Sequence, residues 1–329
     1  MRTLNALLID FYDSAQHCSV SDYHRHALKQ LKKQVAFDSA ALVDVAITPD
    51  RKISIQTIFL DSTPMERFSD RVDAVGQESI GKDGALSSTD AILAAAFQRR
   101  GQSVVADVAE YTTDSRTLSY CRKYDTAHSL AFIAEKTFAN SIPALALWRA
   151  RKRDSYRKAH SQQANLVIPH LIQARDINRR FRLGPAGQSR SSATVLANHA
   201  GLLYFIESEG IALLQMEWPQ WSPPFIPAPM IAALRTSSPC QFRGRAITAQ
   251  AQVLDDMLCL TLSARLPAGA CLTGAEYRTA VLAARGLQYK EIARQLDISA
   301  ATVRNHLHAA YRKLGVTNKT GLAAALPDR

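Results

Sequence analysis

Apolar positions near the N-terminus recur with a period of two, which is the pattern of half-buried β-strands. Two such stretches flank a turn at Pro49-Asp50 and together predict a β-hairpin, with an amphipathic helix before it. Further along, the pattern predicts a helix at 89–98 and strands at 103–108, 130–134 and 144–148. Residues 1–148 are therefore expected to form an α+β module. The apolar faces of the first helix and the hairpin consist of Leu28, Leu31, Val35, Ala41, Val43, Val45, Ile47, Ile53, Ile55, Thr57 and Phe59.

A second module of the same kind is predicted over 185–268. Short apolar strands at 193–197 and 202–205 flank a turn at 198–201, and strands at 246–253 and 258–262 pair across Asp255-Asp256. Trp218 and Trp221 lie between the two hairpins, where core or lid packing is their expected role. Between the two modules, residues 149–184 are predicted to form a basic helical linker that Pro169 must interrupt or kink.

From Leu272 onward, the apolar period changes to that of amphipathic helices. Thr273 and Glu276 have capping-box spacing, so a helix is predicted to begin just after Leu272, and Gly286 suits its C-terminal end. A second, short helix is predicted over about 290–296, and a tight turn follows at 297–298.

Ser299 is placed to cap a third helix that ends near Leu314, with Gly315 as its stop. Roughly 15 residues make a rod of about 22 Å, which is long enough to lie in a major groove. A fourth helix is predicted to begin near Asn318. The apolar stripe of the third helix is Val303, Leu307, Ala310 and Leu314, its polar face is Arg304, Asn305, His308 and Arg312, and the fourth helix presents Leu322, Ala325 and Leu326.

The chain carries a formal net charge of +11, which favours a polyanionic partner such as nucleic acid. Two segments carry this excess, because 148–184 has ten Lys or Arg against two acidic residues and 272–329 has nine against four. Five cysteines are scattered without a CxxC pair, which favours neither a disulfide framework nor a zinc site. Since the sequence shows neither a signal peptide nor a run of about 18 apolar residues, a cytoplasmic protein without a membrane partner is expected.

The C-terminal pattern resembles the LuxR/GerE-type helix-turn-helix domain in the order and spacing of its residues. The resemblance implies an all-α, four-helix DNA-binding domain over 269–329, in which the third helix is the recognition helix. The residues that carry it are Leu272, Thr273, Glu276, Val281, Leu282, Gly286, Lys290, Glu291, Ile292, Ala293, Leu296, Ile298, Ser299, Thr302, Val303, His306, Leu307, Tyr311, Lys313, Leu314, Gly315, Val316 and Asn318.

The resemblance and side-chain chemistry together imply residue roles. Arg304, Asn305 and His308 are expected to face base edges, because arginine suits guanine O6/N7 and asparagine suits adenine N6/N7. Ser299 and Thr302 lie in the first turn of the third helix, where free N–H groups favour a phosphate. The fourth helix commonly forms the dimer contact in this family. The cations expected to hold the DNA backbone are Lys290, Arg294 and Lys313, and the dimerisation candidates are Leu322, Ala325 and Leu326.

The two N-terminal modules resemble GAF and PAS sensor domains. The Pro-His-Leu element at 169–171, with the arginine-rich stretch after it, is similar to linkers of LuxR-type regulators that carry paired sensors. The expected fold class is therefore multidomain, with α+β sensor modules followed by an all-α helix-turn-helix domain. The alternating faces at 41–47 and 53–59 predict one of two outcomes, a mostly apolar ligand pocket or a dry core in a domain that only dimerises.

These features predict a sequence-specific transcriptional regulator that binds an inverted-repeat operator in double-stranded DNA as a homodimer. RNA polymerase and a small molecule of unknown identity are candidate further partners, and no cofactor, metal or enzymatic activity is expected. Two alternatives stay open. One is an acyl-homoserine-lactone receptor, although the first tryptophan is Trp148 and no Asp-Pro pair is present. The other is an enzyme-like sensor fused to a DNA-binding domain, which turnover of a metabolite would favour.

Overall fold

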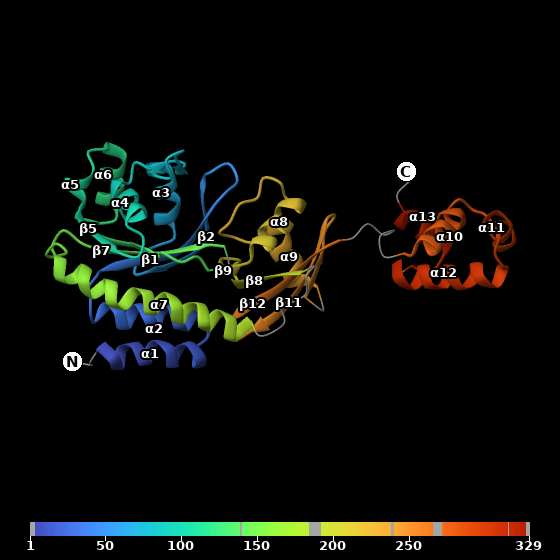
Figure 1. Ribbon diagram of the computed structural model, residues 1–329, viewed down its shortest axis with the longest axis horizontal. Helices are drawn as coiled ribbons and strands as arrows, with labels where there is room; N and C mark the ends of the chain where they lie inside the picture. Colours follow the sequence, from blue (N-terminus) through green and yellow to red (C-terminus); the bar gives the residue numbers. More distant parts are fainter. Residues whose placement is uncertain are drawn as a thin grey trace. The chain divides into compact units, whose positions relative to one another are not determined.

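Figure 1 shows the computed structural model of the chain, which describes residues 4–138, 140–183, 192–237, 240–265, 272–314 and 316–326. The chain divides into two compact units, Met1–Ser263 and Ala264–Arg329. Across the described ranges, no helix combines the length and the apolar character that a membrane span requires.

The first unit contains an antiparallel five-stranded sheet, which follows two N-terminal helices. Its strands are β1 (Ser39–Ile47), β2 (Ile53–Asp61), β5 (Ser103–Asp107), β6 (His128–Ile133) and β7 (Ile142–Arg149). They lie in the order β2-β1-β7-β6-β5. The β1–β2 hairpin predicted from the alternation is confirmed, and its register shifts between Asp44 and Val45.

Helices cover both faces of this sheet. Successive residues of a strand point to opposite sides, and both sides carry apolar residues that pack against helices. The covering elements are α1 (Leu4–His17), α2 (Val20–Lys32), α3 (Glu66–Val75), β3 (Ser79–Ile80), β4 (Leu86–Ser87), α4 (Ala91–Gln98), α5 (Val108–Tyr111), α6 (Ser115–Lys123) and α7 (Lys158–Leu183). On one face, Leu42 and Leu145 join the main core with α1, α2 and α7. On the other face, Ala131 and Ala144 pack toward α4, α5 and α6. Figure 1 shows α3, α4, α5 and α6 on one side of the sheet and α1, α2 and α7 on the other.

A second five-stranded sheet follows in the same unit. Its elements are β8 (Ser192–Asn198), β9 (Leu203–Ile206), α8 (Ser208–Glu217), α9 (Ala228–Thr236), β10 (Gln241–Arg243), β11 (Ile247–Leu254) and β12 (Met257–Ala264). The strand order is β10-β11-β12-β8-β9, and both predicted hairpins are present. Leu214 of α8 and Met230 of α9 are fully buried on one face of the sheet, and Trp218 and Trp221 pack against this core.

The two sheets of the first unit share a packed contact. Val20 at the start of α2 forms a buried apolar cluster with Leu196 of β8 and Met257 of β12. Beside it, His24 of α2 meets the Tyr204 ring of β9 edge-on, with ring centroids 5.5 Å apart. Helix α2 therefore contacts both modules.

Helix α7 is continuous through Pro169, so of the two expected effects of this residue, interruption or a kink, the interruption is wrong. Proline removes one backbone N–H donor. Its neighbours Ile168 and Leu171 are nevertheless fully buried, and Tyr12 of α1 is hydrogen-bonded to His170 Nδ1 at 2.9 Å. Packing on both sides of the proline offsets the lost hydrogen bond.

Many cations of the predicted basic linker are paired inside the first unit. Arg175 and Arg179 bind Asp44 of β1, Arg180 binds Asp176, and Arg153 binds Asp38. These ion pairs reduce the positive charge that the stretch can offer to a polyanion. The domain boundaries expected at 148–149 and 184–185 stay predictions.

The second unit consists of four described helices around one apolar core. They are α10 (Gly274–Ala284), α11 (Tyr289–Leu296), α12 (Ala300–Leu314) and α13 (Lys319–Ala325). Gly286 has a φ of 94°, a conformation that favours glycine, and it follows α10 as predicted. The predicted stop at Gly315 lies outside the described residues. The structure thus confirms the fold class, two α+β modules followed by an all-α domain.

Candidate nucleic-acid interface and sensor cavity

Local capping interactions define the helices of the second unit. Thr273 and Glu276 form both hydrogen bonds of the predicted capping box at the start of α10. Ser299 Oγ accepts a 3.0 Å hydrogen bond from the Thr302 N–H and so caps α12. Asp297, between α11 and α12, has a φ of 53°, which makes the turn between these helices tight. These signals place the start of α12 where the sequence predicted it.

Helix α12 separates its apolar and polar side chains as the sequence predicts. Val303, Leu307 and Ala310 are at most 1% exposed and belong to the core of the domain. The opposite face is polar and open to solvent along the helix. Its exposed residues are Arg304, Asn305, His308 and Arg312.

The residues expected to hold phosphates lie at accessible positions. Lys290 and Arg294 are exposed on α11, and Ser299 is exposed before α12. The Ser299 and Thr302 hydroxyls lie 2.8 Å apart at the start of α12. Hydroxyls and free N–H groups at a helix N-terminus suit an anionic oxygen. His306 is half-buried, between the core and the solvent.

Lys313 has a partner inside the domain. Its Nζ donates hydrogen bonds to both carboxylate oxygens of Glu276, at 2.9 and 2.6 Å. The hydrogen bond from the Lys313 ammonium holds the pKa of Glu276 below its ordinary value, and the hydrogen bond from the Thr273 N–H adds to this effect. The ion pair connects the C-terminal turn of α12 to the capping box of α10. The Lys313 ammonium therefore already has a structural role. A phosphate contact by Lys313 stays a prediction.

The fourth helix differs from the expectation. Leu322 is fully buried and Leu326 is 7% exposed, and both belong to the core of the domain. Leu322 and Leu326 are therefore covered by their own domain in the single chain, and a dimer contact through them stays a prediction. The sequence pattern could not show which apolar face of a short helix closes onto its own domain. The side chain of Ala325 lies outside the described residues.

This geometry coincides with a family match. The luxR family of bacterial regulatory proteins (GerE) matches residues 271–326. Residues 271–326 are a LuxR-family DNA-binding domain. This domain supports the role of a DNA-binding transcriptional regulator, as the sequence predicted. The comparison with curated proteins gave no match.

Comparison with solved structures gave weak similarities. Escherichia coli SdiA has 11% identity and a TM-score of 0.36, with 98% of this chain and 95% of that chain covered. The N-acylhomoserine lactone-dependent LuxR-family factor CepR2 from Burkholderia cenocepacia has 12% identity and a TM-score of 0.39, covering 52% and 92%. The GAF domain/HD domain protein from Geobacter sulfurreducens has 16% identity and a TM-score of 0.31, covering 48% and 93%. We therefore base the function on the LuxR domain and on this chain's own geometry.

The first module contains the cavity that the alternating strands predicted as one of two outcomes. Its volume is about 130 Å³, and it lies on the face of the first sheet opposite α1, α2 and α7. Val43 and Val45 of β1 and Ile53 and Ile55 of β2 contribute to its wall. This face of the sheet is therefore not fully packed, and binding of a ligand in the cavity stays a prediction. Most of the lining is apolar, which suits an apolar ligand.

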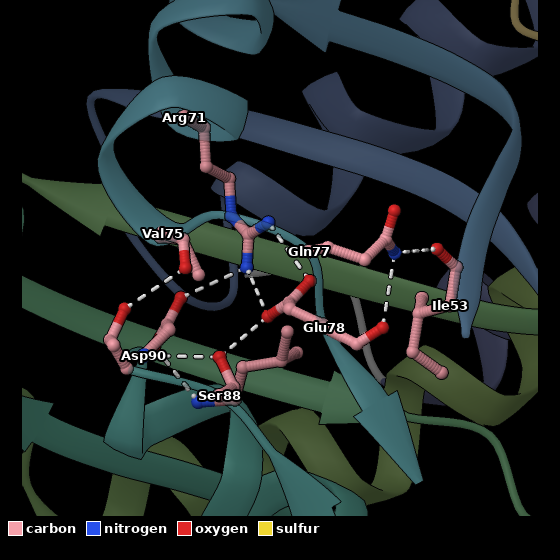
Figure 2. Close-up of polar contacts among 9 residues, drawn as sticks. Ile53, Arg71, Val75, Gln77, Glu78, Ser88 and Asp90 are labelled. Carbon is pink, nitrogen blue, oxygen red and sulfur yellow. Dashed lines mark hydrogen bonds and ion pairs between the residues drawn. The ribbon is translucent and has the colours of Figure 1, made fainter. Parts of the chain in front are cut away.

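A polar network joins the elements that cover this cavity (Figure 2). Arg71 of α3 donates hydrogen bonds to Glu78, at 3.0 and 3.2 Å, and to Asp90, at 3.3 Å. Ser88 donates to Glu78 at 2.6 Å, and Asp90 caps α4 by accepting from the Leu93 N–H. Burial alone would lower the pKa of Arg71, but Glu78 and Asp90 raise it above its ordinary value. The network ties α3, the segment before β3 and the start of α4 together.

Sequence reasoning missed these polar cavity residues. Arg71, Glu78 and Asp90 come from a helix, a loop and a helix cap, and no shared spacing links them. Only the Asp90 cap before an apolar helix carried a local signal, and that signal indicates a helix start rather than a site. Within the described ranges, no cluster of three or more His, Cys, Asp or Glu is arranged to hold a metal ion.

Proposed function

We propose that this regulator reads a specific operator with the exposed face of α12. The observation that carries the proposal is the solvent-exposed strip of Arg304, Asn305 and His308 on a helix whose opposite side is buried. A helix held by its apolar side on its own domain can present the polar side to a major groove. Arginine and asparagine can each form two hydrogen bonds to one base, and this pairing gives base preference.

Phosphate contacts position the same face on the duplex. Lys290 and Arg294 supply exposed positive charge on α11, and Ser299 and Thr302 supply hydroxyls at the start of α12. Such contacts add affinity that is independent of sequence and falls with salt. The net charge of +5 over 272–329 supports this role.

The active form is a homodimer on an inverted repeat. One domain reads few base pairs, and two domains related by a twofold axis double the site. The first unit offers apolar surface for self-association, since Leu166 and Phe181 of α7 are 54% and 62% exposed. Because the dimer acts on the chromosome, it works in the cytoplasm. It would regulate transcription either by contacting RNA polymerase or by excluding the polymerase from a promoter.

The first module controls the DNA-binding domains by binding a small molecule in its cavity. Val43 and Val45 line the cavity, whereas Asp44 between them points to α7 and binds Arg175 and Arg179. A ligand that prefers one position of β1 therefore acts on α7 through one buried ion pair. Helix α7 also contacts the second module, because Arg182 forms an ion pair, at 3.6 Å, with Asp255 between β11 and β12.

Selection of bound sequences from random DNA by the full chain tests this function. We expect an inverted repeat, and we expect Arg304→Ala to lose preference at one base pair in each half-site. Arg285→Ala is the matched control, since it removes an exposed arginine from the end of α10 rather than from α12. An unchanged base preference in Arg304→Ala would show that α12 does not read bases with this face.

A further inference from the structure

Arg67 of α3 is a buried cation at the wall of the sensor cavity. The residue is 2% exposed, and its guanidinium lies 3.6 Å from the ring centroid of Trp148. It donates hydrogen bonds to the hydroxyls of Thr126 at 2.6 Å, Ser39 at 3.1 Å and Tyr120 at 3.3 Å. Neutral hydroxyls and aromatic rings thus surround this charge.

In the part of the chain that the structure describes, Arg67 has no carboxylate partner. Its neighbour Arg71, one helical turn away, instead has two, Glu78 and Asp90. A buried charge is costly when no opposite charge compensates it. Hydroxyls and rings offset part of that cost, and an anion beside the guanidinium would offset more.

A second, smaller cavity adjoins this guanidinium. Its volume is about 50 Å³, and Arg67, Tyr120 and Trp148 line both cavities. Thr117 lies in its wall with a buried hydroxyl that lacks a hydrogen-bond partner of acceptable geometry among the described residues, although the Asp114 carboxylate is nearby.

Arg71 and Asp90 also line both cavities, and Glu78 lines the larger one, whose other walls are mostly apolar. Since Glu78 and Asp90 are paired with Arg71, Arg67 is left as the cation of these walls without a carboxylate partner among the described residues.

From this arrangement we infer that the ligand is a small monocarboxylate with an apolar body, and that Arg67 binds its carboxylate. A cavity of about 130 Å³ is close to the ~150 Å³ that accepts benzene, so it fits an aryl ring or a short alkyl chain. One water needs about 10–15 Å³ of cavity volume by the same measure, so the smaller cavity, of about 50 Å³, has room for a carboxylate. Guanidinium and carboxylate are geometrically matched for paired hydrogen bonds. The inference rests on the proposed sensing role of the first module.

Matched acids and amides test the inference on the full-length wild-type chain. The probes are benzoate, phenylacetate and hexanoate, each paired with its amide, and decanoate as a size control. We expect at least one of the three short acids to raise the melting temperature and to bind at least tenfold more tightly than its amide in calorimetry. Decanoate should not bind, because its chain exceeds the cavity.

Three variants separate the role of the charge from that of the cavity. Arg67→Gln should weaken acid binding at least tenfold and remove the preference for acid over amide. Ala146→Leu, from the sheet wall, should weaken binding of acids and amides alike by filling the larger cavity. Arg149→Lys is the matched control, because Arg149 is also buried and stacked on an aromatic ring, at 4.0 Å from Tyr156, but lines neither cavity. It should leave acid affinity unchanged.

Two results would overturn the inference. Both can be seen by comparing acids with amides on the wild-type chain, without any variant. Equal binding of acids and amides would contradict the charge recognition, while leaving a sensing role for the cavity. No binding of any short acid would exclude this ligand class. Operator binding by the same preparation is measured separately, so a failure of DNA recognition is distinguishable from either result.

Discussion

Arg179 of α7 donates a 2.8 Å hydrogen bond to Asp44 of β1, and the two side chains are only 6% and 3% exposed. Arg175 binds the other oxygen of the same carboxylate. Asp44 is also the residue at which the β1–β2 register shifts. The strand that walls the sensor cavity is thus held to α7 by one carboxylate between two arginines.

Loss of this carboxylate should destabilise the first unit strongly. Asp44→Asn leaves two buried arginines without their counter-charge, and breaking a buried ion pair on one side typically costs about 3–5 kcal/mol. Denaturant unfolding of the full chain measures the loss. Asp50→Asn breaks an exposed ion pair with Lys52 and should change stability little. Similar losses in the two variants would contradict a special role for Asp44.

Stability should fall as the pH drops below neutrality, partly because of His24. Burial, followed by the nearby Arg179 and Arg175, holds the pKa of His24 well below its ordinary value, while the Val20 carbonyl and Asp44 oppose this shift. In the unfolded chain His24 has an ordinary pKa of about 6.5, so below that pH the unfolded state gains a proton that the folded state excludes. One such proton contributes a slope of up to about 1.4 kcal/mol per pH unit.

The variant His24→Gln tests this slope. Unfolding free energies of wild type and variant, measured from pH 5.5 to 8.5, should differ by a constant amount above about pH 7.5. Below about pH 6.5 the wild type should lose stability faster than the variant. Parallel curves over the whole range would mean that His24 takes up its proton over the same pH range in the folded and the unfolded state, against its burial.

Substitutions on the two DNA-facing helices should have different signatures. Asn305→Ala should cost about 1–3 kcal/mol at one preferred base and relax specificity there. Lys290→Ala should weaken all sequences about equally and reduce the slope of affinity against salt by about 1. Binding titrations on operator and mismatched DNA at several salt concentrations separate these effects. A uniform loss in Asn305→Ala would assign Asn305 to the backbone instead.

Lys313 offers a way to separate a structural role from a phosphate contact. Its ion pair with Glu276 predicts that Lys313→Ala and Glu276→Gln each destabilise the LuxR domain and that the double variant loses less than the sum. A pure phosphate contact predicts no stability change in Lys313→Ala and a smaller salt slope. Unfolding and DNA titrations of the same four proteins decide between these outcomes.

Local signals in the sequence predicted the LuxR domain well. The Thr273–Glu276 capping box, the Ser299 cap and the stripe of Val303 and Leu307 depend on spacing within one or two helical turns. Such features are visible in sequence because the interacting residues are neighbours along the chain. The alternation around Val43 similarly predicted the hairpin and one wall of the cavity.

The remaining features depend on contacts between distant residues. Arg175 pairs with Asp44 across 131 positions, so the charge count of the linker could not reveal that this charge is neutralised inside the unit. Arg67 meets Ser39, Tyr120, Thr126 and Trp148 only after the sheet has formed. No periodicity records such a convergence, because each residue belongs to a different element.

Leu322 provides the sharpest contrast between expectation and structure in the LuxR domain. Its side chain is fully buried in the core of the domain. Leu322→Ala should therefore lower the stability of the LuxR domain by about 2–5 kcal/mol, the usual cost of deleting a buried leucine side chain. Denaturant unfolding of the full chain, with DNA binding as a readout of the LuxR domain, measures this loss.

A dimer contact at Leu322 predicts a different result. Sedimentation would then show a shift from dimer to monomer, with little change in the unfolding of the LuxR domain at high protein concentration. Ala323→Ser provides the control, because Ala323 is exposed on the same helix and its substitution keeps the core intact. If Leu322→Ala dissociated the protein without destabilising the domain, the packing of α13 against its own domain would have to be abandoned.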